Sequence, residues 1–191
     1  DGWLSFFSDK VVPWRIGMAA DLRRKLEEEV LPRYVEAQRW YAAKGEALAA
    51  ARIRDHAVWE VGEGRGGAMS WLLTLLEAGA ATYFLPLALA WEEDEEHVRQ
   101  LAQSTLVRVR QQANVGVVGD AMADEAFCRN VVRAIGDQRT VPTEGGTIRF
   151  TPTQSFAGLA GADLAGLTAS PLQAQSTNTS ASDGCTRIES V

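Results

Sequence analysis

The chain has 191 residues, enough for one large domain or two small ones with a sizeable core. Its content of 46% hydrophobic and 23% charged residues is typical of a globular protein. The net charge of −6 and the lack of a Lys/Arg block argue against a duplex-binding surface, so we expect no nucleic-acid partner.

The cysteines and the apolar segments indicate the compartment. Cys128 and Cys185 lie far apart and suggest no disulfide framework, which favours a reducing, cytoplasmic setting. The stretch WLSFF is too short for a signal peptide. The longest apolar run, AGAATYFLPLALAW, is shorter than the ~20 residues a membrane helix needs, so we expect no membrane partner. A cloned fragment, a processed product or a piece of a longer polypeptide would each explain the start at Asp1 rather than Met, and we favour the last.

Residues 19–31 have the pattern of an amphipathic helix. Leu22, Leu26 and Val30 recur every four residues, with charged residues between them. Pro32 should stop or kink this helix, because proline lacks the backbone N–H that a helix interior needs. A second short helical turn then leads toward Trp40.

Three strand-like segments follow, at residues 50–59, 69–77 and 82–91. The first alternates apolar and charged residues, and the second has the consecutive apolar residues of a strand covered on both faces. Pro86 restricts the third to an edge or a bulge. The sequence therefore predicts an α+β fold in which an N-terminal helix packs on an antiparallel sheet.

A smaller α+β segment should follow this sheet. Residues 105–110 alternate like a strand, and residues 124–135 have the spacing of an amphipathic helix. A hairpin-type turn at residues 144–146 leads into the short strand TIRFTP. From Ser155 onward the chain is rich in Gly and Ala and is typical of a connector.

Three features could carry chemistry, but each has a simpler structural interpretation. The acidic run at residues 92–96, ending in His97, lacks the spacing of a calcium loop and suits a solvated loop or a helix first turn. GEGRGG (62–67) lacks the Lys-Ser/Thr of a P-loop and suits a strand connection. His56 is expected to be exposed and non-catalytic. We expect no catalytic residue and no metal site.

The stretch QRWYAAKG combines a basic residue with two adjacent aromatics. Trp40 and Tyr41 would bury a large area at the end of the helical segment, and Lys44-Gly45 would end it. Arg39 could pair with an acid or stack on a ring. Composition favours a structural packing corner. Its residues are Gln38, Arg39, Trp40, Tyr41, Lys44 and Gly45.

The segment VLPRYVEAQRWYAAKGEALAAARIRDHAVW resembles the N-terminal cap of maltokinases, including those fused to trehalose synthase. The resemblance continues through FLPLALAW, LVRVR and GVVGDAMADEAFCRNVVRAIGDQRTVPTEGGTIRFTPT, and covers most of residues 22–153 in order. Tyr41 and Ala43 stand where the family is expected to have Phe and Gly. The family has a kinase architecture like that of aminoglycoside phosphotransferases and transfers the ATP γ-phosphoryl group to the anomeric hydroxyl of maltose.

The resemblance also implies a nucleotide phosphate loop at AQSTNTSASDG, with an extra Thr177. Ser176, Thr179 and Ser180 would be its phosphate-binding residues. All lysines precede this loop, whereas phosphoryl transfer needs a Lys and metal ions at the phosphates. The resemblance therefore implies the front third of a sugar kinase, inactive alone and binding no cofactor alone. ATP and Mg would bind to the full-length enzyme.

The same resemblance implies a division of the chain and a set of partners. An N-terminal extension would occupy residues 1–18, the cap 19–100, an intermediate segment 101–154, and a connector with the truncated start of the phosphate loop 155–191. The partner would be the C-terminal kinase lobe, with trehalose synthase as a further one. Two alternatives stay open: a stand-alone protein-interaction module derived from such a cap, and the same region of a kinase for another sugar such as glucosamine.

Overall fold

The chain has an α+β fold in which helices cover both faces of one antiparallel sheet. The computed structural model describes residues 3–6, 20–41, 43, 45, 47–64, 67–111, 113–156, 158, 170–171, 180–182 and 187–189. The predicted fold class, an N-terminal helix packed on an antiparallel sheet, is confirmed.

The central sheet has five antiparallel strands in the order β5-β6-β4-β3-β2. They are β2 (Ala51–Gly64), β3 (Gly67–Ala78), β4 (Ala81–Trp91), β5 (Thr105–Gln111) and β6 (Asn114–Asp120). A sixth strand, β1 (Trp3–Phe6), pairs in parallel with β5. Because β5 and β6 belong to the same sheet as β2–β4, the sheet extends across residue 100.

The N-terminal helix continues through Pro32 instead of ending there. It consists of α2 (Ala20–Lys25), a π-helical segment η1 (Leu26–Val30) and α3 (Leu31–Ala37). Pro32 occupies the first turn of α3, where its missing N–H costs least. The wider π turn directly before it, in which the Leu31 N–H donates to the Leu26 carbonyl, accommodates the change of hydrogen-bond pattern.

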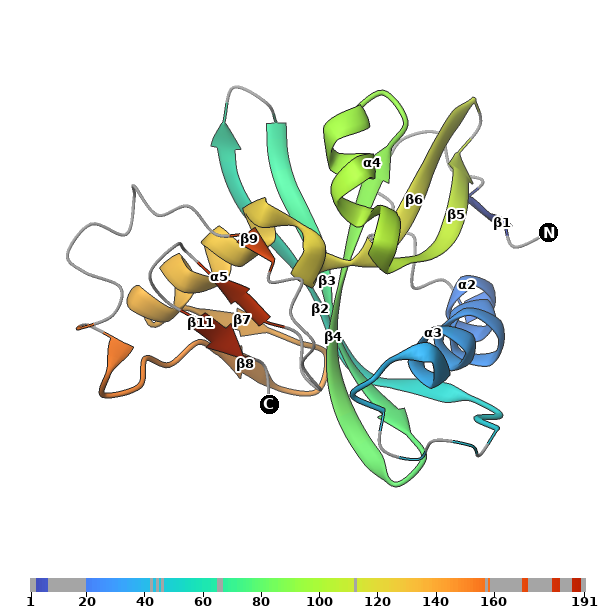
Figure 1. Ribbon diagram of the computed structural model, residues 1–191, viewed down its shortest axis with the longest axis horizontal. Helices are drawn as coiled ribbons and strands as arrows, with labels where there is room; N and C mark the ends of the chain where they lie inside the picture. Colours follow the sequence, from blue (N-terminus) through green and yellow to red (C-terminus); the bar gives the residue numbers. More distant parts are fainter. Residues whose placement is uncertain are drawn as a thin grey trace.

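Two apolar layers lie on opposite faces of the sheet (Figure 1). On one face, Leu26, Leu31 and Val35 of the helical segment pack against buried leucines of β3 and β4. On the other, α5 (Glu125–Gly136) packs through Phe127 against Trp71 of β3. The sheet is therefore buried from both sides, as the consecutive apolar residues of β3 indicated.

The second layer contains several short elements. These are α4 (Glu95–Leu101), the 3-10 turns η2 (Ala102–Ser104) and η3 (Ala121–Ala123), and the hairpin of β7 (Thr140–Pro142) and β8 (Thr147–Arg149). A separate small sheet joins β9 (Ser170–Pro171), β10 (Ser180–Ser182) and β11 (Arg187–Glu189). The helix predicted at residues 124–135, the turn at 144–146 and the acidic helix first turn are confirmed.

Two strand features depend on glycine and proline. Pro86 lies in a central strand, but pairing of β4 with β6 begins only at Leu87, so Pro86 has a neighbouring strand on the β3 side alone.

Strand β6 was not predicted, because Gly116 and Gly119 weaken its pattern. At Gly116 an added Cβ would lie 2.5 Å from the carbonyl oxygen of Ala90, so β4 and β6 need glycine there.

Among the described residues, no helix combines the length and the apolar character needed to span a membrane.

We predict that Gly116→Ala lowers the free energy of unfolding by about 1 to 3 kcal/mol, because its Cβ would overlap the backbone of Ala90 and the ring of Trp91. Urea unfolding measures the change. Gly158→Ala is the control, since nothing lies within 4 Å of its added Cβ. Equal stability of the two variants would contradict the close approach of β4 and β6.

Candidate functional site

The predicted corner at residues 38–45 is a junction between the first helix and the β3–β4 hairpin. Helix α3 ends at Ala37, and Gln38 is already extended, with its side-chain amide donating to the Tyr34 carbonyl at 3.1 Å. The rings of Trp40 and Tyr41 lie 5.0 and 6.1 Å from the ring of Tyr83 in β4. The aromatic pair therefore holds the end of the helix to the sheet.

Arg39 and Gly45 lie outside that aromatic contact. Arg39 is exposed, and Lys44 lies outside the described residues. Gly45 has a φ of +91°, a backbone conformation that favours glycine, but the helix ends eight residues earlier, so Gly45 is not its cap. The corner has the character of packing: Tyr41 is 3% exposed and Trp40 is half-buried.

Asp124, at the start of α5, joins three elements of the second layer. Its Oδ2 accepts from Trp71 Nε1 of β3 at 2.7 Å and lies 3.2 Å from His97 Nε2 of α4. Its Oδ1 accepts from the backbone N–H groups of Ala126 and Phe127, which caps α5. Asp124 is 2% exposed, and four contacts within the protein occupy its two carboxylate oxygens.

The contact between Asp124 and His97 favours the charged form of each group. Burial alone would raise the pKa of Asp124, but the hydrogen bonds from His97 and Trp71 hold it below its usual value. Burial likewise opposes protonation of His97, yet the bond to Asp124 raises its pKa above the usual value. The sequence pointed to Asp124 only as the start of a helix and to His97 only as the end of an acidic run.

Asp120, four residues earlier, faces the first helix. Its Oδ2 accepts from the Tyr34 hydroxyl of α3 at 3.3 Å, and its Oδ1 accepts from the Met122 N–H at 2.9 Å. Burial raises the pKa of Asp120 to about 6, against the opposing effect of these two hydrogen bonds. Burial and the neighbouring Asp120 carboxylate raise the pKa of Tyr34. This pair ties α3 to the turn after β6.

His56 differs from its prediction. Its side chain is only 10% exposed, because the turn after β7 covers it, and its Nδ1 lies 3.6 Å from a carboxylate oxygen of Glu144. The neighbouring Asp55 carboxylate accepts from the Thr143 hydroxyl at 2.5 Å and from the Gly145 N–H at 3.2 Å. These contacts fix the β7–β8 turn to β2 and give His56 a structural setting.

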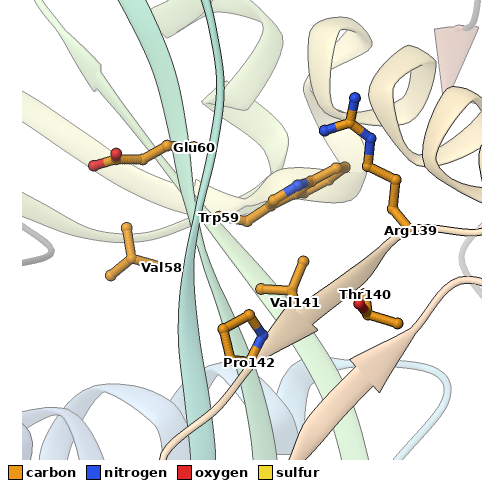
Figure 2. A pocket seen from close by; sticks show the side chains of 7 residues that line it. All are labelled: Val58, Trp59, Glu60, Arg139, Thr140, Val141 and Pro142. Carbon is orange, nitrogen blue, oxygen red and sulfur yellow. The ribbon is translucent and has the colours of Figure 1, made fainter.

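A groove of about 420 Å³ lies between β2 and β7 (Figure 2). Its lining residues are Val58, Trp59, Glu60, Arg139, Thr140, Val141 and Pro142. In Figure 2 the ring of Trp59 points away from Val58 and Glu60, toward the side of Arg139. That ring is 5% exposed and stacks on Phe150 at 5.2 Å, so it is packed inside the protein and offers no open aromatic platform.

Three kinds of reactive group can be checked in the part of the chain that the structure describes: a cysteine thiol, clusters of metal ligands and the predicted phosphate-loop residues. Burial raises the pKa of the Cys128 thiol to about 12, so this thiol is not a thiolate near neutral pH. The described residues contain no group of three or more His, Cys, Asp or Glu side chains placed to hold a metal ion. Of the predicted phosphate-loop residues, Ser176 and Thr179 lie outside the described residues, and Ser180 begins β10, opposite Glu189.

The polar groups described above connect the layers of the fold to its sheet, and one family comparison covers the same part of the chain. Residues 34–124 match the maltokinase N-terminal cap domain. The matched segment begins at Tyr34 and ends at Asp124, and it contains all five antiparallel strands. A search of curated proteins found no match. The resemblance to the maltokinase cap is therefore supported over the central sheet.

We predict that Trp40→Ala lowers the free energy of unfolding by about 2 to 3 kcal/mol, since it removes a half-buried ring that packs on Tyr83. Arg39→Ala, an exposed neighbour, should change it by less than about 0.5 kcal/mol. Chemical denaturation of both variants measures this. If Trp40→Ala unfolded like the wild type, the corner would not be a packing site.

A second prediction concerns the buried carboxyl of Asp120. The pKa of Asp120 rises from 3.8 in the unfolded chain to about 6 in the folded protein, so the folded state binds this proton more tightly. The free energy of unfolding is therefore higher when the carboxyl is protonated, and this contribution is lost as the pH rises through about 6. Asp120→Asn lacks this effect. Relative to the wild type, its free energy of unfolding should increase by on the order of 2 to 3 kcal/mol between about pH 4 and pH 7.

Urea unfolding across this pH range measures the free energy of unfolding of the variant and of the wild type. The wild-type value is subtracted from the variant value at each pH, so the titrations of His97 and Asp124, which both proteins share, cancel. Asp137→Asn removes an exposed carboxylate and should give a curve parallel to the wild type. A parallel curve for Asp120→Asn as well would show that Asp120 does not titrate in the predicted range.

Proposed function

We propose that this chain is the N-terminal cap and intermediate region of a maltokinase-type sugar kinase. In the complete enzyme, the activity would be ATP-dependent phosphorylation of maltose to maltose 1-phosphate. The observation that carries the proposal is the match of residues 34–124 to the maltokinase cap. It is supported by the sheet, since the match runs from Tyr34 to Asp124, the residues that attach the helical layers to the strands.

The cap would act by packing rather than by chemistry. Three aspartates accept hydrogen bonds from other elements of the fold through their carboxylate oxygens: Asp55, Asp120 and Asp124. A rigid two-layered unit of this kind is suited to support a neighbouring lobe. We propose the C-terminal kinase lobe as the partner, with trehalose synthase as a further partner in fused enzymes. The complete enzyme would act in the cytoplasm and bind ATP and Mg.

A stand-alone interaction module is the second candidate. Phe84 of β4 is 42% exposed and Met69 of β3 is 43% exposed, and both are large apolar side chains on the outside of the sheet. Exposed apolar side chains of this size can contribute to a protein contact. A partner captured through Phe84 by the chain in the absence of a kinase lobe would favour this candidate.

A domain exchange tests the leading proposal. We expect a maltokinase whose cap is replaced by residues 20–154 of this chain to phosphorylate maltose, because the same sheet and corner would support the lobe. The 191-residue chain alone should neither transfer phosphate to maltose nor give binding heat with ATP·Mg²⁺ and maltose. Coupled phosphorylation assays and isothermal titration measure both.

The control is the same exchange carrying Trp40→Ala, which should give a less heat-stable enzyme with unchanged KM for ATP. An inactive but folded exchange enzyme would refute the cap assignment. Turnover by the 191-residue chain alone would refute the non-catalytic role.

A further inference from the structure

His56 of β2 has an unpartnered ring nitrogen inside the protein. Its side chain is 10% exposed, and its Nδ1 is buried without a hydrogen-bond partner among the described residues. Buried polar atoms in proteins nearly always have a partner, so this nitrogen needs an explanation. A histidine nitrogen with a free lone pair is a common metal ligand.

A carboxylate faces this nitrogen from the β7–β8 turn. The Glu144 Oε2 lies 3.6 Å from the His56 Nδ1, and the Glu144 side chain is 69% exposed. One donor atom therefore lies inside the protein and the other at its surface, where water can reach the far side of the carboxylate.

The separation of these two atoms indicates what fits between them. A direct hydrogen bond would place a nitrogen and an oxygen about 2.7 to 3.2 Å apart. A water bridging them with two bonds of about 2.8 Å at a tetrahedral angle would place them about 4.6 Å apart. Two ligands of one zinc-sized ion, each about 2.0 to 2.2 Å from the metal, lie about 3.4 to 3.6 Å apart. The observed 3.6 Å fits the metal ion best.

The turn that carries Glu144 is held in place by its neighbours. The Thr143 hydroxyl and the Gly145 N–H both donate to the Asp55 carboxylate, at 2.5 and 3.2 Å. The Gly146 N–H donates to the Thr143 Oγ1 at 2.8 Å. Glu144 thus lies between two residues bonded to β2. Its backbone position does not depend on its own side chain, and such support by neighbouring hydrogen bonds is what a binding site needs.

We propose that His56 Nδ1 and Glu144 Oε2 are two ligands of a site for a divalent transition-metal ion of the zinc type. Water completes the coordination on the exposed side of Glu144. An imidazole with a carboxylate suits zinc, cobalt or nickel, whereas magnesium and calcium prefer oxygen ligands alone. With two protein ligands, fewer than in a structural zinc site, the ion binds reversibly and fastens the β7–β8 turn to β2.

This site departs from the sequence-based expectation of no metal site. The two ligands come from distant segments, so no ligand spacing could reveal them. The described residues contain no group of three protein ligands, and this pair is consistent with that finding. The site does not depend on the assignment to a kinase, so the domain exchange and the metal test can fail separately.

Zinc and cobalt ions alone are the probes, added to the 191-residue chain after treatment with a chelator. Every protein carries Cys185→Ser, which removes a thiol that could bind metal by itself. Isothermal titration should show one zinc ion per chain. The midpoint of thermal unfolding should rise with zinc concentration, because the ion joins two elements only in the folded state. Paramagnetic cobalt should broaden the amide signals of His56 and Glu144.

Glu144→Ala removes the exposed ligand and should weaken zinc binding by about tenfold or more. His56→Ala should do the same. Asp137→Asn is the matched control, because it removes an exposed carboxylate elsewhere on the surface, and it should bind zinc as the wild type does. If His56→Ala fails to fold, Glu144→Ala carries the test, since its side chain is mostly exposed.

The proposal is overturned if Glu144→Ala binds zinc as tightly as Asp137→Asn. It is also overturned if the wild type binds no zinc, a result that would leave a direct ion pair between His56 and Glu144. Cobalt broadening confined to other residues would overturn it as well.

Discussion

The buried carboxylate of Asp124 is the contact on which the arrangement of the second layer depends. It accepts hydrogen bonds from β3 and from the backbone of α5, and it pairs with His97 of α4. An ionised carboxylate at 2% exposure is stable only when such partners surround it. Because its partners come from three elements, moving any one of these elements would leave the buried carboxylate with fewer hydrogen bonds, which is costly.

The turn that carries Asp124 also attaches the first layer. Asp120, at the end of β6, accepts from Tyr34 of α3 on the opposite face of the sheet. A turn of five residues thus connects both helical layers to the last strand. The aromatic contact of Trp40 and Tyr41 with Tyr83 gives the first helix a second attachment at its end. These two contacts attach the helix to the sheet at its end and in its last turns, beside the bonds of Arg23 and Glu27 with Ile53 of β2.

Local sequence patterns predicted the elements whose own apolar residues recur at helix or strand spacing. The apolar spacing of residues 124–135 was enough to find α5, and the alternation in β2 and β4 was enough to find these strands. Strand β6 could not be found in this way, since Gly116 and Gly119 are favoured there by close contact with β4, α4 and η2 rather than by strand propensity. The helix was predicted to stop or kink at Pro32, but it continues because a π turn shifts the hydrogen-bond pattern just before the proline.

The polar contacts were beyond such patterns, because their partners are far apart in the sequence. Tyr34 and Asp120 are separated by 86 residues, and Trp71 and Asp124 by 53. Yet both aspartates lie in the stretch GDAMADEAF, and Tyr34 is the second residue of the stretch RYVEAQRWY. These are two of the segments that carry the resemblance to maltokinase caps. These segments hold the layers together and contain no described reactive constellation. The match to the maltokinase cap at residues 34–124 therefore covers the segments whose side chains connect the two layers to the sheet.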